Sequence, residues 1–229
     1  MTRRIVIAID GPAGAGKSTI AKRLAERLGF TYIDTGAMYR AIGLWAIRAG
    51  ADLADMHRLE QLAVAADIRL EAGGTRIILN GEDVTEAIRT TPISDAASKV
   101  SAVPAVRRAL VEKQRQTAAR TSVVMEGRDI GTVVFPGAEV KIFLDADTRV
   151  RAGRRVLERA QKGETVRPGE IASEIHARDE RDRGRADSPL VQAPDAVYLD
   201  TSGLGIDEVE ERILKIVRDR TSNGKELQR

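Results

Sequence analysis

The residues with the clearest chemical meaning are GPAGAGKST at positions 11–19. They satisfy the phosphate-loop pattern G-x-x-x-x-G-K-[ST], whose backbone amides surround the phosphates of a nucleoside triphosphate. Glycine allows the close turns of such a loop, and the following helix adds its positive N-terminal end. Lys17 would reach the β and γ phosphates of ATP, and the Ser18 hydroxyl would bind the Mg²⁺ that bridges them. The predicted ATP contacts span the motif: Gly11, Pro12, Ala13, Gly14, Ala15, Gly16, Lys17, Ser18 and Thr19.

The segments on either side of this motif supply the structural context that it requires. Residues 4–10 are rich in β-branched side chains and predict a strand, while residues 18–28 have an amphipathic helical pattern that ends at Gly29. The alternative is a chance match in a glycine-rich chain, and such a match would not bring this strand and helix with it. The motif therefore predicts a working phosphate loop.

The rest of the chain alternates strands with helices, which is typical of a parallel α/β sheet. Residues 67–84 break the series, because alternating apolar residues and two glycine-containing turns indicate a small antiparallel insert. We predict strands at 4–10, 31–34, 122–125, 140–145 and 197–200, and helices at about 18–28, 37–49, 92–101, 104–119, 148–161, 168–183 and 206–218. The fold class is α/β, with a five-stranded parallel sheet flanked by helices.

Ligands of such sheets bind beyond the carboxyl ends of the strands. The residues that follow the second and third predicted strands are therefore candidates for a binding site. Those residues are DTGAMYR and EGRDIG, and both segments carry charges and glycine.

Composition argues against several other kinds of protein. The 229 residues include no cysteine and only two histidines, so we expect no disulfide scaffold and no histidine-based zinc site. No apolar run approaches the length of a membrane span, and we expect a cytoplasmic protein without a membrane partner. The net charge of +3 is small and the bases are interleaved with acids, so we expect no nucleic-acid partner.

Five segments in this order, GPAGAGKS, DTGAMYR, EGRDIGTVVFP, VKIFLDA and RDERDRGR, resemble the bacterial cytidylate kinases over nearly the whole chain. The insert also resembles one that these kinases carry in their region for binding the nucleoside monophosphate (NMP). The resemblance implies a monomeric P-loop kinase that transfers the γ-phosphoryl group of ATP to CMP or dCMP with Mg²⁺. It further implies one domain over residues 1–229, with a core at about 1–34, 101–147 and 187–229, an NMP-binding region at 35–100, and a short helical lid followed by an acceptor-binding helix at 148–186.

Phosphoryl transfer needs cations around two phosphate groups and no protein nucleophile. By resemblance, Arg40 and Arg128 grip the phosphate of the acceptor CMP, which agrees with their positions after two predicted strands. The alternatives are a solvated helix residue for Arg40, and for Arg128 an ion pair with Asp129 or Glu126.

Cytosine needs an acceptor for its exocyclic amine and donors for N3 and O2, and a carboxylate beside a guanidinium provides both. By resemblance, Asp129 is that acceptor, and Arg107 and Ser98 are the other contacts to the base. Ionised Asp129 would repel the O4 atom of UMP, which would give the discrimination a physical cause. Thr35 stands where many relatives have serine, so the hydroxyl is kept.

The segment RDERDRGR carries three further candidates, Arg178, Asp182 and Arg185. Their i, i+4, i+7 spacing would put two cations and one carboxylate on one helix face, although a solvated charged face is the usual alternative. By resemblance, Arg178 and Arg185 face the phosphate and base of the acceptor, and Asp182 faces its ribose hydroxyls.

The lid segment contains several arginines, of which Arg154 and Arg155 are our candidates for contact with the transferring phosphoryl group. The predicted catalytic residues are therefore Lys17, Arg128, Arg154 and Arg155. Two other functions are alternatives: a P-loop kinase for another small acceptor, such as shikimate or a different nucleotide, and a nucleotide-gated switch or binding protein. A GTPase switch would have an N-K-x-D motif, which this sequence lacks, and a shikimate-type kinase would not explain the insert or the pairing of Arg107 with Asp129.

Overall fold

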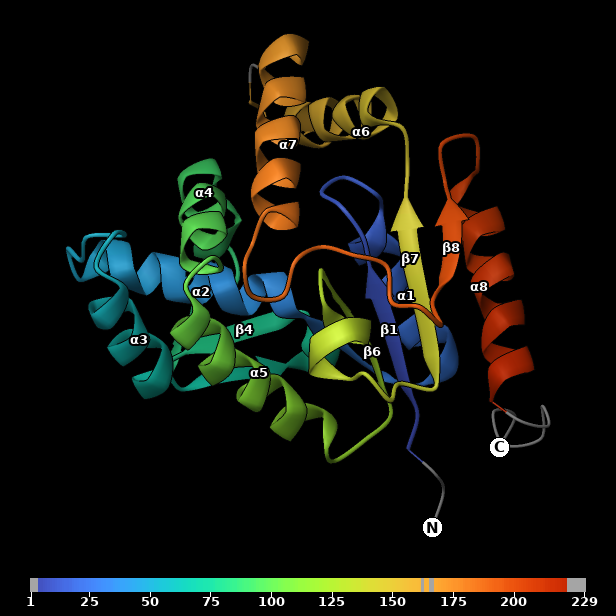
Figure 1. Ribbon diagram of the computed structural model, residues 1–229, viewed down its shortest axis with the longest axis horizontal. Coiled ribbons are helices and arrows are strands. Elements are labelled where there is room, and N and C mark those ends of the chain that lie inside the picture. Colours follow the sequence, from blue (N-terminus) through green and yellow to red (C-terminus); the bar gives the residue numbers. More distant parts are fainter. Residues whose placement is uncertain (1–3, 162, 165–166, 222–229) are drawn as a thin grey trace.

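The computed structural model describes residues 4–161, 163–164 and 167–221. Its main sheet has five strands in the order β2 (Thr31–Asp34), β6 (Val123–Gly127), β1 (Val6–Asp10), β7 (Val140–Asp145) and β8 (Val197–Asp200). Neighbouring strands are parallel throughout, and Ile7 of β1 lies opposite both Val124 and Val140. The predicted five-stranded parallel sheet is therefore confirmed (Figure 1).

Helices cover both faces of this sheet, so its strands are apolar on both sides. On one face, Ile7 and Ile9 pack with α1 (Lys17–Leu28) and α8 (Ile206–Arg220). On the other face, Ala8 packs with α5 (Pro104–Ala118) and with a π-helical turn at Ile130–Val134. This enclosure leaves the carboxyl edge of the sheet as the place where polar residues gather.

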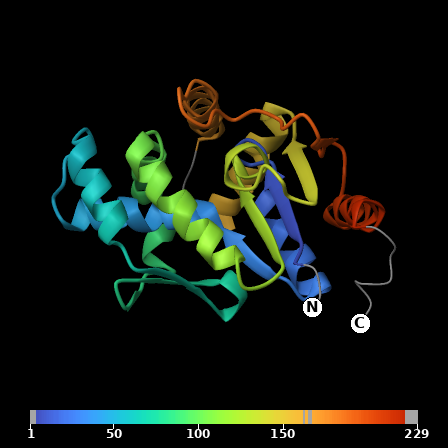
Figure 2. The ribbon, with the colours of Figure 1, turned by 60° about the horizontal axis from the view of Figure 1, so that its bottom comes forward.

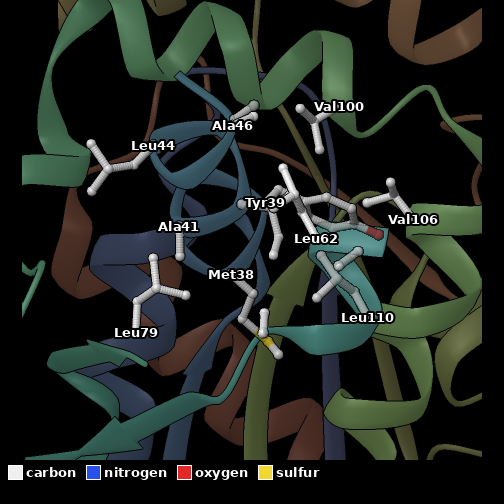
Figure 3. Close-up of a cluster of buried hydrophobic side chains, with 14 of the residues drawn as sticks. Met38, Tyr39, Ala41, Leu44, Ala46, Leu62, Leu79, Val100, Val106 and Leu110 are labelled. Carbon is white, nitrogen blue, oxygen red and sulfur yellow. The ribbon is translucent and has the colours of Figure 1, made fainter. Parts of the chain in front are cut away.

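The chain after β2 builds a second apolar core around α2 (Thr35–Arg48), shown in Figure 3. Buried side chains of α2, including Met38, meet side chains of α3 (Met56–Ala65), α4 (Thr91–Val100) and α5. Gly43 allows α2 and α4 to approach closely, because a Cβ atom there would lie 3.1 Å from the backbone nitrogen of Ala97. This core fixes α2 relative to α5.

The predicted insert is a small antiparallel sheet of β3 (Ile68–Glu71), β4 (Arg76–Leu79) and β5 (Glu82–Asp83). Figures 1 and 2 show it beside α2, on the side away from α7 (Pro168–Arg183). Two elements here were not predicted, the two-residue strand β5 and the helix α3. The side chain of Asp55 caps α3 by accepting from the backbone of Arg58 at 2.9 Å, which is a signal that the sequence does carry.

Helices α6 (Thr148–Gln161) and α7 stand beyond the carboxyl ends of the strands (Figure 1). They pack on each other through a small apolar cluster that includes Ala152, Ile171 and Ile175. Both helices have the predicted bounds.

Other bounds differ by a few residues. The helix predicted from about residue 37 begins at Thr35, because the side chain of Asp34 accepts from the backbone nitrogen of Ala37 at 2.9 Å and caps α2. The last helix runs to Arg220 rather than residue 218. Within the described ranges, no helix is long and apolar enough to cross a membrane.

Candidate active site

The phosphate loop joins β1 to α1 with glycines in conformations that other residues rarely adopt. Gly11, Gly14 and Gly16 have φ angles of +148°, +77° and +90°. A Cβ atom on Gly11 would lie 1.9 Å from the carbonyl oxygen of Leu144 in β7, so this glycine is needed for packing against the sheet. Gly16 caps α1 without a side-chain hydrogen bond, which leaves the positive end of the helix directed at the loop.

Lys17 opens α1 and is nearly buried, with its Nζ donating to the carbonyl oxygen of Pro12 at 2.7 Å. Burial and the neighbouring charge of Arg128 lower the pKa of Lys17 to about 7, against the opposing effect of Glu126. A buried cation beside another cation favours an incoming anion such as a phosphate.

The hydroxyl of Ser18 donates to Oε2 of Glu126 at 2.9 Å. The other oxygen of this buried carboxylate accepts from the Tyr32 hydroxyl at 2.5 Å. Burial and nearby Asp34 raise the pKa of Glu126. Sequence reasoning considered Glu126 only as an ion-pair partner, although its place at the end of β6, next to β1, could have marked it.

Arg107 of α5 and Asp129 after β6 form a buried ion pair. Arg107 also donates to the backbone oxygen of Ser101 at 3.1 Å, and its guanidinium lies 5.6 Å from the centre of the Tyr39 ring. The nearby hydroxyl of Ser98 is buried and has no hydrogen-bond partner among the described residues. This corner therefore offers a carboxylate, a guanidinium and an unpaired hydroxyl.

Asp182 of α7 lies among three arginines. Arg128 donates to it at 2.8 Å, Arg185 pairs with its other oxygen, and Arg178 lies 4.0 Å away. Burial opposes ionisation, but these guanidinium groups lower the pKa of Asp182 to about 2. Burial and Arg128 in turn lower the pKa of Arg178 to about 9.

Arg185 does not share one helix face with Arg178 and Asp182, so this prediction is wrong. α7 ends at Arg183 with Gly184 as its cap, so Arg185 lies beyond the helix. The turn after the helix nevertheless returns Arg185 to Asp182, and Arg185 also donates to the hydroxyl of Ser101 at 2.8 Å.

Arg40 pairs at 2.7 Å with Asp34, the same residue whose side chain caps α2. The hydroxyl of Thr35 donates to the backbone oxygen of Glu126 at 2.7 Å, so it ties α2 to β6 in this structure. Both residues lie beyond the carboxyl end of β2, because α2 follows this strand directly.

The two lid arginines have different partners. Arg154 donates to the backbone oxygen of Thr201 at 2.8 Å and to its hydroxyl at 3.1 Å, which ties α6 to the end of β8. Arg155 pairs with Glu158 on its own helix at 2.7 Å.

These groups surround one cleft of about 1120 Å³, a size at the upper end for small-molecule sites. All but two of the predicted site residues line it: Ala13, Gly14, Ala15, Gly16, Lys17, Ser18, Thr19, Thr35, Arg40, Ser98, Arg107, Arg128, Asp129, Arg154, Arg155, Arg178, Asp182 and Arg185. Gly11 and Pro12 are not among the lining residues, and they shape the loop from behind. Asp10, beneath the loop, accepts from the backbone nitrogens of Ile130 and Gly131 at 2.8 and 2.7 Å.

The phosphate loop follows the first strand of a parallel sheet, and a cluster of arginines lines the same cleft. This combination defines a P-loop kinase. The family model described as cytidylate kinase matches residues 7–219. A cytidylate kinase from Solibacter usitatus is 63% identical over 98% of this chain and 97% of its own length. A cytidylate kinase from Syntrophotalea carbinolica is 50% identical over 96% and 94%. The chain therefore belongs to the cytidylate kinase family.

Solved structures add agreement on the fold only. An uncharacterized protein from Eubacterium ventriosum superposes with a TM-score of 0.55 and 13% identity, covering 95% of this chain and 100% of its own.

Proposed function

We propose that this protein transfers the γ-phosphoryl group of ATP to CMP or dCMP, giving ADP and CDP or dCDP. The observation that carries the proposal is that one cleft joins the phosphate loop to the buried Arg107–Asp129 pair. Membership of the cytidylate kinase family supports the same substrates.

The phosphate loop binds the donor. Its backbone amides and the N-terminus of α1 receive the phosphates, and Lys17 leaves the carbonyl of Pro12 to contact the β and γ oxygens. Mg²⁺ fits here because the Ser18 hydroxyl and the Glu126 carboxylate supply the oxygen ligands that this ion prefers. When bound, Mg²⁺ would offset negative charge on the transferring phosphoryl group.

Arginines bind the phosphate of the acceptor. Arg40, Arg128 and Arg178 line the cleft opposite the loop, and each is held near a carboxylate that orients it. Holding the acceptor phosphate in line with the γ-phosphoryl group is the main work of such an enzyme, since no protein nucleophile takes part. Arg154 and Arg155 of α6 line the same cleft, which supports their assignment to the transferring phosphoryl group.

The cytosine base lies at the corner formed by Arg107, Asp129 and Ser98. Asp129 accepts from the exocyclic amine, and Arg107 donates to the ring nitrogen and carbonyl. The unpaired hydroxyl of Ser98 supplies another contact, because a buried hydroxyl without a partner is stabilised by a hydrogen bond from a ligand. Asp182 binds the ribose hydroxyls and Arg185 the region of the base, and Thr35 lines the same cleft.

The same family membership supports three broader proposals. The chain works as one kinase domain with a core, an NMP-binding region and a lid that follow the ranges predicted above. It acts in the cytoplasm, and it acts as a monomer.

Product analysis tests the proposed reaction. Wild-type protein is incubated with Mg²⁺ and ATP, alone and with CMP, dCMP or shikimate, and the nucleotides are separated by chromatography. We expect equal amounts of ADP and CDP or dCDP, and a loss of kcat of about 100-fold or more in Lys17→Ala with the fold intact. ATP binding without any acceptor-dependent ADP would reject the kinase proposal and favour a switch.

A further inference from the structure

A buried ion pair lies between the phosphate loop and α7, and the proposed reaction gives it no role. Arg151 of α6 and Asp179 of α7 meet at 2.6 Å, and their side chains are 4% and 5% exposed. Among the described residues that line the cleft, neither is present, so neither is placed to touch a nucleotide.

Arg151 uses all three of its guanidinium nitrogens. Its Nε donates to the backbone oxygen of Ala146 at 2.9 Å, and its Nη2 donates to the hydroxyl of Thr148 at 3.0 Å. Its Nη1 donates both to Asp179 and to the backbone oxygen of Ala13 in the phosphate loop, the latter at 3.0 Å. This guanidinium therefore joins the end of β7, the loop and α7 in one network.

Asp179 binds Ala13 of the phosphate loop as well. Its Oδ1 accepts from the backbone nitrogen of Ala13 at 3.4 Å, so both backbone groups of Ala13 are bound by the ion pair. Gly14 follows, and a Cβ atom there would lie 3.1 Å from the Cβ of Arg151. The pair and the backbone of α6 thus set the conformation of the loop at the residues that must receive the phosphates.

The helix that carries Asp179 also carries the acceptor site. Arg178 and Asp182 lie one residue before and three residues after Asp179 in α7, and Asp182 binds Arg128 at 2.8 Å. A helix moves as a stiff unit, so a shift of α7 when an acceptor binds also moves Asp179 against Ala13. Helix α7 and the Arg151–Asp179 ion pair thus connect the acceptor site to the phosphate loop.

We propose that Arg151 and Asp179 are positioning residues that couple the acceptor site to the phosphate loop, so that each nucleotide binds more tightly when the other is present. This coupling rests on the proposed function, because it needs a donor in the loop and an acceptor against α7. By linkage, the two nucleotides must strengthen each other's binding by the same factor.

Isothermal titration measures that factor. The non-hydrolysable ATP analogue AMP-PNP, with Mg²⁺, is titrated into the full chain with and without saturating CMP, and CMP is titrated with and without AMP-PNP. We expect about fivefold or greater tightening in the wild type, in both directions. Asp179→Asn should bring the factor close to one, while the affinity for CMP alone stays within about twofold.

Glu180→Gln is the matched control, because it makes the same chemical change one residue along α7 at an exposed side chain. It should keep the wild-type factor. If Asp179→Asn does not fold, the double variant Arg151→Met with Asp179→Leu removes both charges and leaves no unpaired buried ion. A change in the coupling factor at unchanged CMP affinity is a readout that a loss of stability alone would not produce.

Three results separate the possibilities. A factor of one in the wild type, or an unchanged factor in the variants, would overturn the coupling. Failure of either nucleotide to bind the wild type alone would instead count against the proposed function. Loss of the factor in Asp179→Asn or the double variant, with Glu180→Gln unchanged, would support the proposal.

Discussion

At the scale of single residues, the carboxylates of the cleft form ion pairs that orient its arginines. Asp34 holds Arg40, Asp129 holds Arg107, and Asp182 holds Arg128 and Arg185. Each pair fixes a guanidinium that would otherwise lose side-chain freedom on binding a nucleotide. The carboxylates are therefore part of the binding site even where they do not touch the ligand.

Asp129 gives the sharpest prediction about the base. Asp129→Ala removes the acceptor for the exocyclic amine of cytosine, so we expect the ratio of kcat/KM for CMP over UMP to fall by about 10- to 100-fold. The affinity for ATP should change much less. Asp129→Asn keeps the shape of the side chain and offers an N–H to the O4 of UMP, so it should lower the same ratio. Equal losses for CMP and UMP would remove Asp129 from base recognition.

Tyr32 gives a prediction about the metal. Tyr32→Phe removes the hydroxyl that holds Glu126, and Glu126 in turn holds the hydroxyl of Ser18. We expect the Mg²⁺ concentration for half-maximal rate to rise about threefold or more, and the protein to lose about 1–2 kcal/mol of unfolding free energy. Metal titration and urea unfolding measure the two effects.

Tyr198→Phe is the control for this change, because its hydroxyl meets Asp145 at 3.3 Å on an exposed side chain. It should alter neither quantity appreciably. The same Mg²⁺ dependence in Tyr32→Phe and the wild type would separate Glu126 from the metal.

At the scale of elements, the order of the strands does much of the positioning. β6 lies between β2 and β1, so the residues that follow β2 and β6 reach the phosphate loop from one side. α7 approaches from beyond the strand ends and brings Arg178 and Asp182 to the same cleft. The acceptor site is thus built by elements that are far apart in the sequence.

The loop itself depends on one close approach. Gly11→Ala would place a Cβ atom 1.9 Å from the backbone of Leu144, at a φ angle of +148°. We expect this variant to lose about 3 kcal/mol or more of unfolding free energy, or to fail to fold. Gly137→Ala is the control, because nothing lies within 4 Å of a Cβ atom there. Thermal unfolding compares the two, and equal stability would contradict the packing role of Gly11.

The sequence predicted the bounds of helices and strands better than the contacts between their side chains. The lid helix α6 and the acceptor-binding helix α7 were both predicted with their observed bounds. Helical spacing, by contrast, applies only within a helix, and α7 ends at Arg183. Arg185 therefore reaches Asp182 through the turn after the helix, which residue spacing does not predict. The Arg151–Asp179 pair was not predicted either, since its two residues are brought together only when α6 and α7 pack.

At the scale of the whole molecule, the five strands and most of the helices were predicted because the apolar pattern of a buried parallel sheet is strong. α3 was missed because its apolar residues face a core formed with helices distant in sequence, which includes Leu59, Leu62 and Leu110. Most of the site residues predicted by motif line the cleft, whereas Glu126 and Tyr32, which also line it, depend on which strands become neighbours.

Acid stability tests the charge network as a whole. Because the pKa of Asp182 is lowered from 3.8 to about 2 in the folded state, this residue stabilises the fold fully above about pH 4. The contribution, about 2 kcal/mol, is lost as the pH falls toward 2. We therefore expect the stability difference between the wild type and Asp182→Asn to shrink over this range. Denaturant unfolding at several pH values measures it.

Glu180→Gln, an exposed acid on the same helix, is the reference for that measurement. Its side chain is 68% exposed, so replacing it shows how much of the measured change comes from removing any one acid from this helix. A difference between the wild type and Asp182→Asn that stays constant from pH 7 to pH 2 would contradict the proposed network.

The most direct test of the proposed specificity is a comparison of kcat/KM for CMP, dCMP, UMP, AMP and GMP with the wild-type protein at a fixed, saturating concentration of ATP and Mg²⁺. We expect the highest values for CMP and dCMP, by about tenfold or more over the other acceptors. A higher value for UMP or a purine nucleotide would contradict the assignment of the Arg107–Asp129 corner to cytosine.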